Sequence, residues 1–166
     1  MPPGALQLAI ISDTHMPRGD RALSEPCLAG LRAADAILHA GDLIAVEVLE
    51  LLESLGPPVH AVHGNVDEPA LRMRLPAVRT VEAGGARLVV THDGGPAGGR
   101  LARLRRRFGD ADAVVFGHSH LPLHEERDGF HTFNPVSPTE CRRAPTHTMG
   151  LATAHDGRLA FAHLTL

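Results

Sequence analysis

The sequence contains no lysine, tryptophan or tyrosine, and cysteine occurs only at Cys27 and Cys141. Two distant cysteines provide neither a disulfide framework nor the ligand spacing of a structural zinc site. The glycine-rich P-loop pattern that holds nucleotide phosphates is absent. The Gly-x-Ser-x-Gly segment that presents a nucleophilic serine is absent as well. The chain therefore lacks several common means of holding or attacking an ester.

Long apolar runs and a large net charge are also missing. The net charge is −3 with histidine neutral, which does not favour nucleic acid or a membrane surface as a partner. No apolar segment approaches the length of about 20 residues that crosses a bilayer. The first residues lack the charged and apolar regions of a signal peptide. We expect a cytoplasmic protein of one domain, residues 1–166, with no membrane or nucleic-acid partner.

One pattern occurs five times: an apolar run is followed by a side chain that can bind a metal ion. The first run, residues 6–11, leads to Asp13 and His15. In an extended chain, residues two apart point to the same side. A carboxylate and an imidazole would then face one place, and both are ligands that first-row divalent metals accept.

The four later runs lead to Asp42, Asn65, His92 and the pair His118 and His120, at intervals of 23 to 29 residues. This is about the length of a strand and a returning crossover, which brings strand ends to one edge of an α/β sheet. We predict a metal site with seven candidate ligands: Asp13, His15, Asp42, Asn65, His92, His118 and His120. Two metals that share a carboxylate use such a set more readily than one metal does. The alternative to a shared metal site is that these residues have separate structural roles in turns and loops.

Apolar periodicity predicts helices over residues 24–32, 45–55, 68–75 and 100–108. Gly84-Gly85, Asp128-Gly129 and Asp156-Gly157 each separate two strand-like runs, which predicts three hairpins. Helices early in the chain and hairpins later favour two packed sheets with helices outside. The arginines of residues 100–107 could form a phosphate patch or a solvated face. His39 and His63 could orient ligands or be structural, and Arg18 could reach a substrate phosphate.

The ordered set of motifs resembles the calcineurin-like metallophosphoesterase superfamily. Residues 64–67 (Gly-Asn-Val-Asp) and 134–137 (Asn-Pro-Val-Ser) resemble its small single-domain phosphodiesterase branch. The resemblance implies an α/β fold, a four-layer αββα sandwich of two packed mixed sheets flanked by helices. It also implies two divalent metal ions, manganese being expected and iron, zinc or nickel being alternatives. One metal would take Asp13, His15, Asp42 and His120, and the other Asp42, Asn65, His92 and His118.

The resemblance further implies a hydrolase acting on phosphoric ester bonds. We expect a metal-dependent phosphodiesterase that attacks a small-molecule phosphate ester with a hydroxide bridging the two metals, and we assign catalytic roles to Asp42, Asn65 and His92. Val66 and Gly94 stand where relatives can carry further histidines, which favours diesters with a good leaving group. The alternatives are a phosphomonoesterase or nucleotide phosphatase with the same site, and a low-activity interaction protein of the same fold. The sequence leaves the oligomeric state open.

Overall fold

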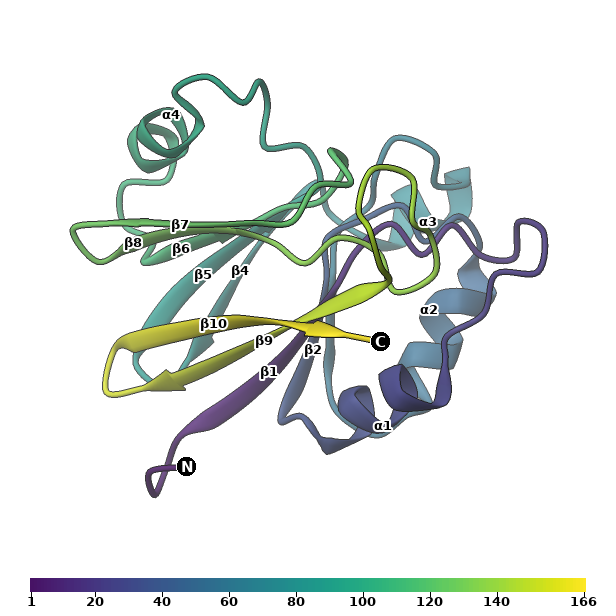
Figure 1. Cartoon of the computed structure of the whole chain (residues 1–166), viewed down its shortest axis with the longest axis horizontal. Coiled ribbons are helices and arrows are strands. Elements are labelled where there is room, and N and C mark those ends of the chain that lie inside the picture. The colour runs from purple at the N-terminus through teal and green to yellow at the C-terminus, as the bar shows by residue number, and fades with distance from the viewer.

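A computed structural model describes residues 1–166 and shows two β-sheets stacked between helices (Figure 1). The helices are α1 (Glu25–Ala33), α2 (Val46–Glu53), α3 (Pro69–Arg74) and α4 (Arg100–Arg107). The strands are β1 (Leu6–Ile11), β2 (Ala36–His39), β3 (Val59–Ala61), β4 (Val78–Ala83), β5 (Ala86–Thr91), β6 (Ala113–Val115), β7 (Leu123–Arg127), β8 (Phe130–Asn134), β9 (Thr148–His155) and β10 (Arg158–Thr165).

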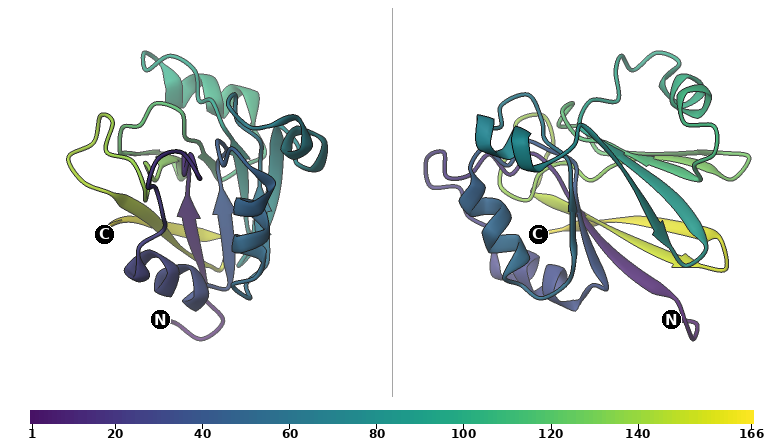
Figure 2. Two further views of the ribbon diagram at one scale, coloured as in Figure 1. Left: turned by 90° about the vertical axis from the view of Figure 1, so that its right-hand side faces the viewer. Right: turned by 180° about the vertical axis from the view of Figure 1, so that it is seen from behind.

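The first sheet has the strand order β10-β9-β1-β2-β3. β1, β2 and β3 are parallel because α1 and α2 return the chain to the same end, whereas β9 pairs with β1 in the antiparallel sense. Helices α1, α2 and α3 lie against the outer face of this sheet (Figure 2). Ala9 and Ile11 of β1 are buried on that face, packed with residues of these helices such as Leu31 and Leu52.

The second sheet has the strand order β4-β5-β6-β8-β7. Helix α4 covers its outer face, where Leu104 packs with Val89, Val114 and Phe116. Between the two sheets lies a third core that includes Leu8 and Ile10 of β1, as well as Leu88 and Phe133. Strand β1 is therefore apolar at consecutive positions because both of its faces are covered.

The layers follow the order helices, sheet, sheet, helix, so the predicted four-layer αββα sandwich is confirmed. The predicted helices and hairpins are present, with ends that differ by no more than two residues. Ser24 caps α1 by accepting a hydrogen bond from the Cys27 backbone N–H at 3.4 Å. None of the helices has both the length and the apolar character needed to cross a membrane.

The five runs that end in candidate ligands do not reach the edge of one sheet, contrary to the prediction from their spacing. The structure divides them: β1, β2 and β3 belong to the first sheet, while β5 and β6 belong to the second. Residues 62–77 carry the chain from the first sheet to the second, so the later strands pair with new neighbours. The candidate site consequently forms between the ends of two sheets.

Candidate metal centre

The candidate ligands lie in the loops that follow β1, β2, β3, β5 and β6. Hydrogen bonds join these loops across the two sheets. His92 Nδ1 lies 2.8 Å from the carbonyl oxygen of Ala40, and the His118 backbone N–H donates to Asp13 Oδ2 at 3.1 Å. The structure thereby brings all seven predicted residues to one place: Asp13, His15, Asp42, Asn65, His92, His118 and His120.

The backbone of these loops differs from the extended chain assumed from the sequence. Asp13 and His15 have φ of 53° and 46°, and Asp42, His118 and His120 also have positive φ. The left-handed conformation is uncommon for residues other than glycine, although Asp and His adopt it more readily than branched residues do. Tight turns, rather than an extended strand, therefore direct Asp13 and His15 to the same place. Backbone of this kind concentrates at functional sites.

Asp13, His15 and His120 form the first group, with donor atoms within 4.8 Å of one another. Asp13 Oδ1 lies 3.8 Å from His15 Nε2 and 3.4 Å from His120 Nε2. The other carboxylate oxygen, Oδ2, accepts a hydrogen bond from the Ser12 hydroxyl at 2.6 Å. One oxygen of Asp13 is thus held in place while the other faces two imidazoles.

Asp42, His92 and His118 form the second group, again with donor atoms within 4.8 Å of one another. The amide oxygen of Asn65 joins them, at 3.0 Å from His92 Nε2 and 3.1 Å from His118 Nδ1. His118 and Asn65 are exposed, whereas His92 and Asp42 are buried. The second group therefore opens to solvent on one side.

A single oxygen of Asp42 lies between the two groups. Asp42 Oδ2 is 3.3 Å from His15 Nε2 in the first group and 3.2 Å from His92 Nε2 in the second. The remaining oxygen, Oδ1, accepts a hydrogen bond from the Val66 backbone N–H at 3.0 Å. This arrangement has the geometry that a shared carboxylate would need.

The electrostatics of the site favour bound cations. Burial lowers the pKa of His15 and His92, but hydrogen bonds with Asp42 and the charge of Asp13 raise both pKa values above the ordinary one. Burial raises the pKa of Asp42, yet its hydrogen bonds with His15 and His92 hold that pKa far below its usual range. Asp42 is therefore an anion between two imidazoles, where protons and metal ions compete for the same atoms.

The residues present fit divalent metal ions. Asp13 Oδ1 is buried without a hydrogen-bond partner, although it faces two imidazole nitrogens. A buried carboxylate oxygen in that state is costly unless a cation satisfies it. Carboxylate oxygens with imidazole nitrogens suit manganese, iron, zinc or nickel. The identity and number of the ions, and the role of each ligand, stay predictions.

Glu140 supports the candidate metal centre through a contact that the sequence pattern did not reveal. Its Oε2 lies 2.5 Å from His15 Nδ1, the nitrogen that faces away from the metal-ligand group. Arg21 and Arg142 each donate to Glu140 Oε1 at 3.0 Å. A carboxylate on the second nitrogen of a metal-binding histidine fixes the orientation of its ring. No local signal could show this contact, because 125 residues separate Glu140 from His15.

Asp67 is a second residue to which the sequence assigned no role. It is buried, and its Oδ2 accepts from the backbone N–H groups of Asp42 at 3.1 Å and Gly64 at 2.7 Å. Its Oδ1 accepts from Ile44 at 2.6 Å. Asp67 therefore ties the loop of Asp42 to the loop of Asn65, which fixes these two candidate ligands relative to each other.

The segment 134–140 supports the loop after β1 through hydrogen bonds. The Ser137 hydroxyl donates to the carbonyl oxygen of Asp13 at 2.7 Å, and the Thr139 hydroxyl donates to that of Thr14 at 2.6 Å. Val136 in this segment has φ of 66°. A β-branched residue in that conformation is strained.

The two histidines with open roles differ in the structure. His39 is fully buried: its Nδ1 accepts from the Gly41 backbone N–H at 3.1 Å, and its Nε2 lies 3.2 Å from the Thr14 hydroxyl. Burial lowers the pKa of His39 to about 3, so it is a neutral structural residue. His63 is half-buried and lines a cavity beside Asn65. Arg18 is exposed and does not line this cavity.

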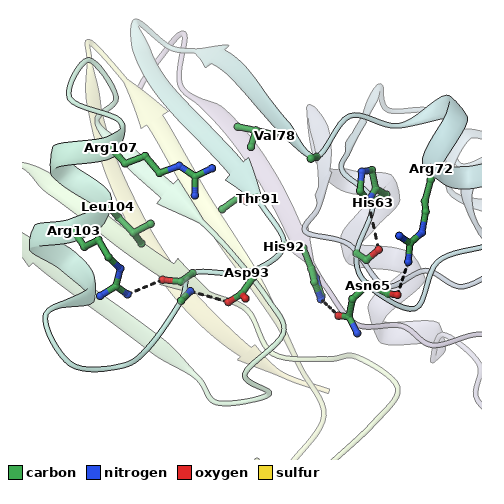
Figure 3. A pocket seen from close by; sticks show the side chains of 14 residues that line it. His63, Asn65, Arg72, Val78, Thr91, His92, Asp93, Arg103, Leu104 and Arg107 are labelled. Atoms are coloured by element: carbon green, nitrogen blue, oxygen red, sulfur yellow. Dashed lines mark hydrogen bonds between the residues drawn. The ribbon is translucent and has the colours of Figure 1, made fainter.

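The arginines of α4 divide between the two interpretations. Arg105 pairs with Asp128 on the surface and Arg106 is exposed, in agreement with a solvated face. Arg103 and Arg107 instead line the cavity that adjoins Asn65 and His92 (Figure 3). Helical periodicity alone could not distinguish a phosphate patch from a solvated face, because the sequence does not show which segments lie beside these arginines.

Comparisons with known proteins agree with this geometry. Residues 6–157 match the family described as the calcineurin-like phosphoesterase superfamily domain. A probable metallophosphoesterase of Methanothermobacter thermautotrophicus is 33% identical over 147 residues, which are 87% of this chain and 84% of that protein. A phosphodiesterase of Methanocaldococcus jannaschii is 22% identical over 143 residues, 78% of this chain and 82% of that protein.

Among solved structures, vacuolar protein sorting 29 of Cryptosporidium parvum has the same fold, with a TM-score of 0.79. The two chains are 21% identical over 98% of this chain and 99% of the other. At this identity the likeness concerns the fold alone. The family match covers both groups of candidate metal ligands, and the curated relatives are phosphoesterases in name. We conclude that the chain belongs to the calcineurin-like phosphoesterase superfamily, and the family and its named relatives indicate a phosphoester hydrolase.

Proposed function

We propose that this protein hydrolyses phosphodiesters of small molecules at a site that holds two divalent metal ions. The observation that carries the proposal is the position of Asp42 Oδ2, within 3.3 Å of one imidazole nitrogen in each ligand group. A shared carboxylate is typical of two-metal centres that act on phosphate esters. When bound, the two ions would supply Lewis acidity toward the phosphoryl oxygens and the attacking water.

The residues of the chain have distinct tasks in this proposal. Asp13, His15 and His120 hold one ion, and His92, His118 and Asn65 hold the other, with Asp42 common to both. The Asn65 amide is exposed at the open side of the site, where its N–H groups can donate to the phosphoryl oxygens. Glu140 and Asp67 keep the ligands in position through the hydrogen bonds described above.

The proposed preference for diesters rests on the lack of a proton donor among the residues beside the metal ligands. Val66 and Gly94 offer no proton to a leaving group, and relatives can carry histidines at these positions. Because no general acid is evident, esters whose leaving group departs readily should react fastest. The phosphodiesterase named among the relatives supports the same class of substrate.

The test is a matrix of metals and substrates on protein first freed of metal. Manganese, iron, zinc and nickel are each added, and hydrolysis of bis(p-nitrophenyl) phosphate is compared with that of p-nitrophenyl phosphate. We expect the diester to react faster, with manganese giving the highest rate. A strong preference for the monoester would favour a phosphomonoesterase. Absence of metal binding would contradict the proposal altogether.

A second candidate is an interaction protein of low activity. The fold likeness to vacuolar protein sorting 29 favours it, because a phosphoesterase fold does not by itself establish catalysis. The same matrix separates the two functions. Two bound metals without turnover of either ester would favour the interaction protein.

A further inference from the structure

A cavity of about 540 Å³ opens beside the candidate metal centre. Asn65 and His92 form part of its wall, so the cavity is continuous with the second ligand group. Its other walls come from α3 and the loop before it, from β4, from β5 and the loop after it, and from α4 (Figure 3). The volume is within the range of small-molecule binding sites. A substrate held at the metal centre can therefore extend into this cavity.

The charge of the cavity is positive. Arg72, Arg103 and Arg107 line it, and Asp93 is its only carboxylate. One oxygen of this carboxylate already has a partner, since Asp93 Oδ1 accepts a hydrogen bond from the Gly95 backbone N–H at 2.7 Å. Arginine side chains gathered around one space favour a phosphate or another anion.

Two of the three arginines are fixed by the backbone. Arg72 donates from Nε to the carbonyl oxygen of Asp67 at 2.9 Å and from Nη2 to that of Asn65 at 2.5 Å. Arg103 Nη2 donates to the carbonyl oxygens of Gly94 at 3.0 Å and Pro96 at 2.7 Å. Their positive charge is held at the wall of the cavity, and their donors are largely used.

Arg107 differs, because its side chain makes no hydrogen bond or ion pair within the protein. Its guanidinium lies over the ring of Phe108, 4.8 Å from the ring centre. In Figure 3 it points from α4 toward Thr91 and Val78, whereas Asn65 and His92 lie on the other side of the cavity. The donors of Arg107 are therefore free to meet a ligand group that lies apart from the metal centre.

Part of the cavity wall is apolar. Ala77, Val78 and Leu104 are the hydrophobic residues of the cavity, and Val78 and Leu104 pack in the core beneath α4. An apolar wall suits the carbon skeleton that links two charged groups. The cavity thus offers metal ligands at one side, an apolar wall and a free guanidinium at the other.

We propose that the cavity binds a second phosphate group of the substrate, joined to the reacting phosphodiester by an organic linker, and that Arg107 selects for it. This inference rests on the proposed function, since it takes the reacting phosphate to be bound at the metal centre. Arg107 acts as a specificity residue and takes no part in the chemical step.

The test uses two aryl diesters that differ by one phosphate. Thymidine 5′-(p-nitrophenyl phosphate) lacks a second phosphate, and its 3′-phosphorylated form carries one. kcat/KM for both is measured on manganese-loaded wild type, Arg107→Ala and the control Arg106→Ala. The control removes the same charge from the neighbouring position of α4, outside the cavity.

We expect wild type to favour the phosphorylated ester by about tenfold, the effect of one charged hydrogen bond. Arg107→Ala should lose most of this preference, and Arg106→Ala should retain it. Equal kcat/KM for the two esters in wild type, or an unchanged preference in Arg107→Ala, would overturn the inference.

A binding measurement separates this inference from the proposed function. Thymidine 3′,5′-bisphosphate and thymidine 5′-monophosphate are titrated by calorimetry into the same three manganese-loaded proteins. If neither ester is hydrolysed, the proposed function fails, and tighter binding of the bisphosphate that depends on Arg107 would still support the subsite. Equal affinity for both nucleotides would contradict the subsite whatever the activity.

Discussion

At the scale of single residues, the site depends on carboxylates whose two oxygens have different partners. Asp13 is held through Oδ2 and presents Oδ1, while Asp42 is held through Oδ1 and presents Oδ2. Glu140 in turn holds the far nitrogen of His15. Each carboxylate thus has one oxygen that fixes its position and one that faces the site or a neighbouring charge.

Asp42→Asn should weaken both metal sites together, because it removes the negative charge that both groups share. His15→Ala removes a neutral ligand from one group, so about one ion should remain bound. We expect the first variant to lose turnover and the second to regain part of it at high metal concentration. Metal content by elemental analysis and turnover of the aryl diester check this, with exposed Asp20→Asn as the control. Two bound ions and near-normal turnover in Asp42→Asn would show that Asp42 does not bridge.

Glu140→Gln should lower metal affinity about 10- to 100-fold, the usual effect of removing a carboxylate that orients a metal-binding histidine. Burial raises the pKa of Glu140, but hydrogen bonds with His15 and Arg142 lower it overall, so the native group is an anion. Glutamine keeps the shape and removes the charge. Metal titration by calorimetry, with exposed Glu25→Gln as the control, measures the effect. Unchanged affinity would mean that the contact is structural only, and Glu140→Asp should restore part of the affinity.

At the scale of elements, the site is made by loops that approach one another closely, and two glycines permit this. A Cβ on Gly64 would lie 2.0 Å from Asp42 Oδ1, and one on Gly117 would lie 1.9 Å from Ser12 Oγ. These approaches bring the loop after β3 against the loop after β2, and the loop after β6 against the end of β1. Any larger residue would force the candidate ligands apart.

Gly64→Ala should displace Asp42 and destabilise the fold by about 1–3 kcal/mol, the usual cost of overpacking. Gly98→Ala is a matched control, because its Cβ would meet nothing within 4 Å. That control should change stability by less than about 0.5 kcal/mol. Urea unfolding of metal-free protein gives the stabilities, and metal titration shows whether Asp42 has moved. Equal metal affinity in the two variants would contradict the steric argument.

At the scale of the molecule, the core between the sheets sets the position of the site. Leu8 and Ile10 of the first sheet pack with Leu88 and Phe133 of the second. The loops at one end of both sheets then meet, and hydrogen bonds of buried His92 with Ala40 and of His118 with buried Asp13 join them. Stability of the whole chain is also coupled to the protonation of His39, because burial lowers the pKa of this histidine to about 3.

Metal-free protein should lose stability as the pH falls below about 6.5, in part through His39. The unfolded chain binds a proton near pH 6.5, whereas in the folded chain the pKa of His39 is about 3. The contribution of neutral His39 is thus fully present above pH 6.5 and decreases as the pH falls toward 3. Between pH 7 and pH 5 we expect it to account for about 2 kcal/mol.

The measurement is urea unfolding of wild type and His39→Gln, both in the presence of a chelator, at several pH values. Glutamine can donate and accept hydrogen bonds but does not titrate in this range. The variant should start less stable and lose about 2 kcal/mol less on acidification. Exposed His147→Gln serves as the control. Parallel pH profiles for wild type and His39→Gln would contradict the prediction, because they would mean that the pKa of His39 is the same in the folded and the unfolded chain.

Much of the fold follows from local patterns. Apolar runs predicted β1, β2, β3, β5 and β6, and the turn pairs Gly84-Gly85, Asp128-Gly129 and Asp156-Gly157 predicted the hairpins that the structure contains. The residue types at the ends of the runs also predicted which side chains would gather. These features depend on periodicity and turn chemistry within a few residues, and such information is present in the sequence.

Other features depend on contacts between distant segments. The division of the five runs between two sheets, the place of Asp42 Oδ2 between two imidazoles and the left-handed turns at Asp13 and His15 arise only when the sheets pack. The contact of Glu140 with His15 and the turn of Arg107 into the cavity are of the same kind. The sequence by itself determined the elements and the chemistry of the candidate ligands. The tertiary structure decided their geometry and their supporting residues, because those contacts link residues that no local pattern relates.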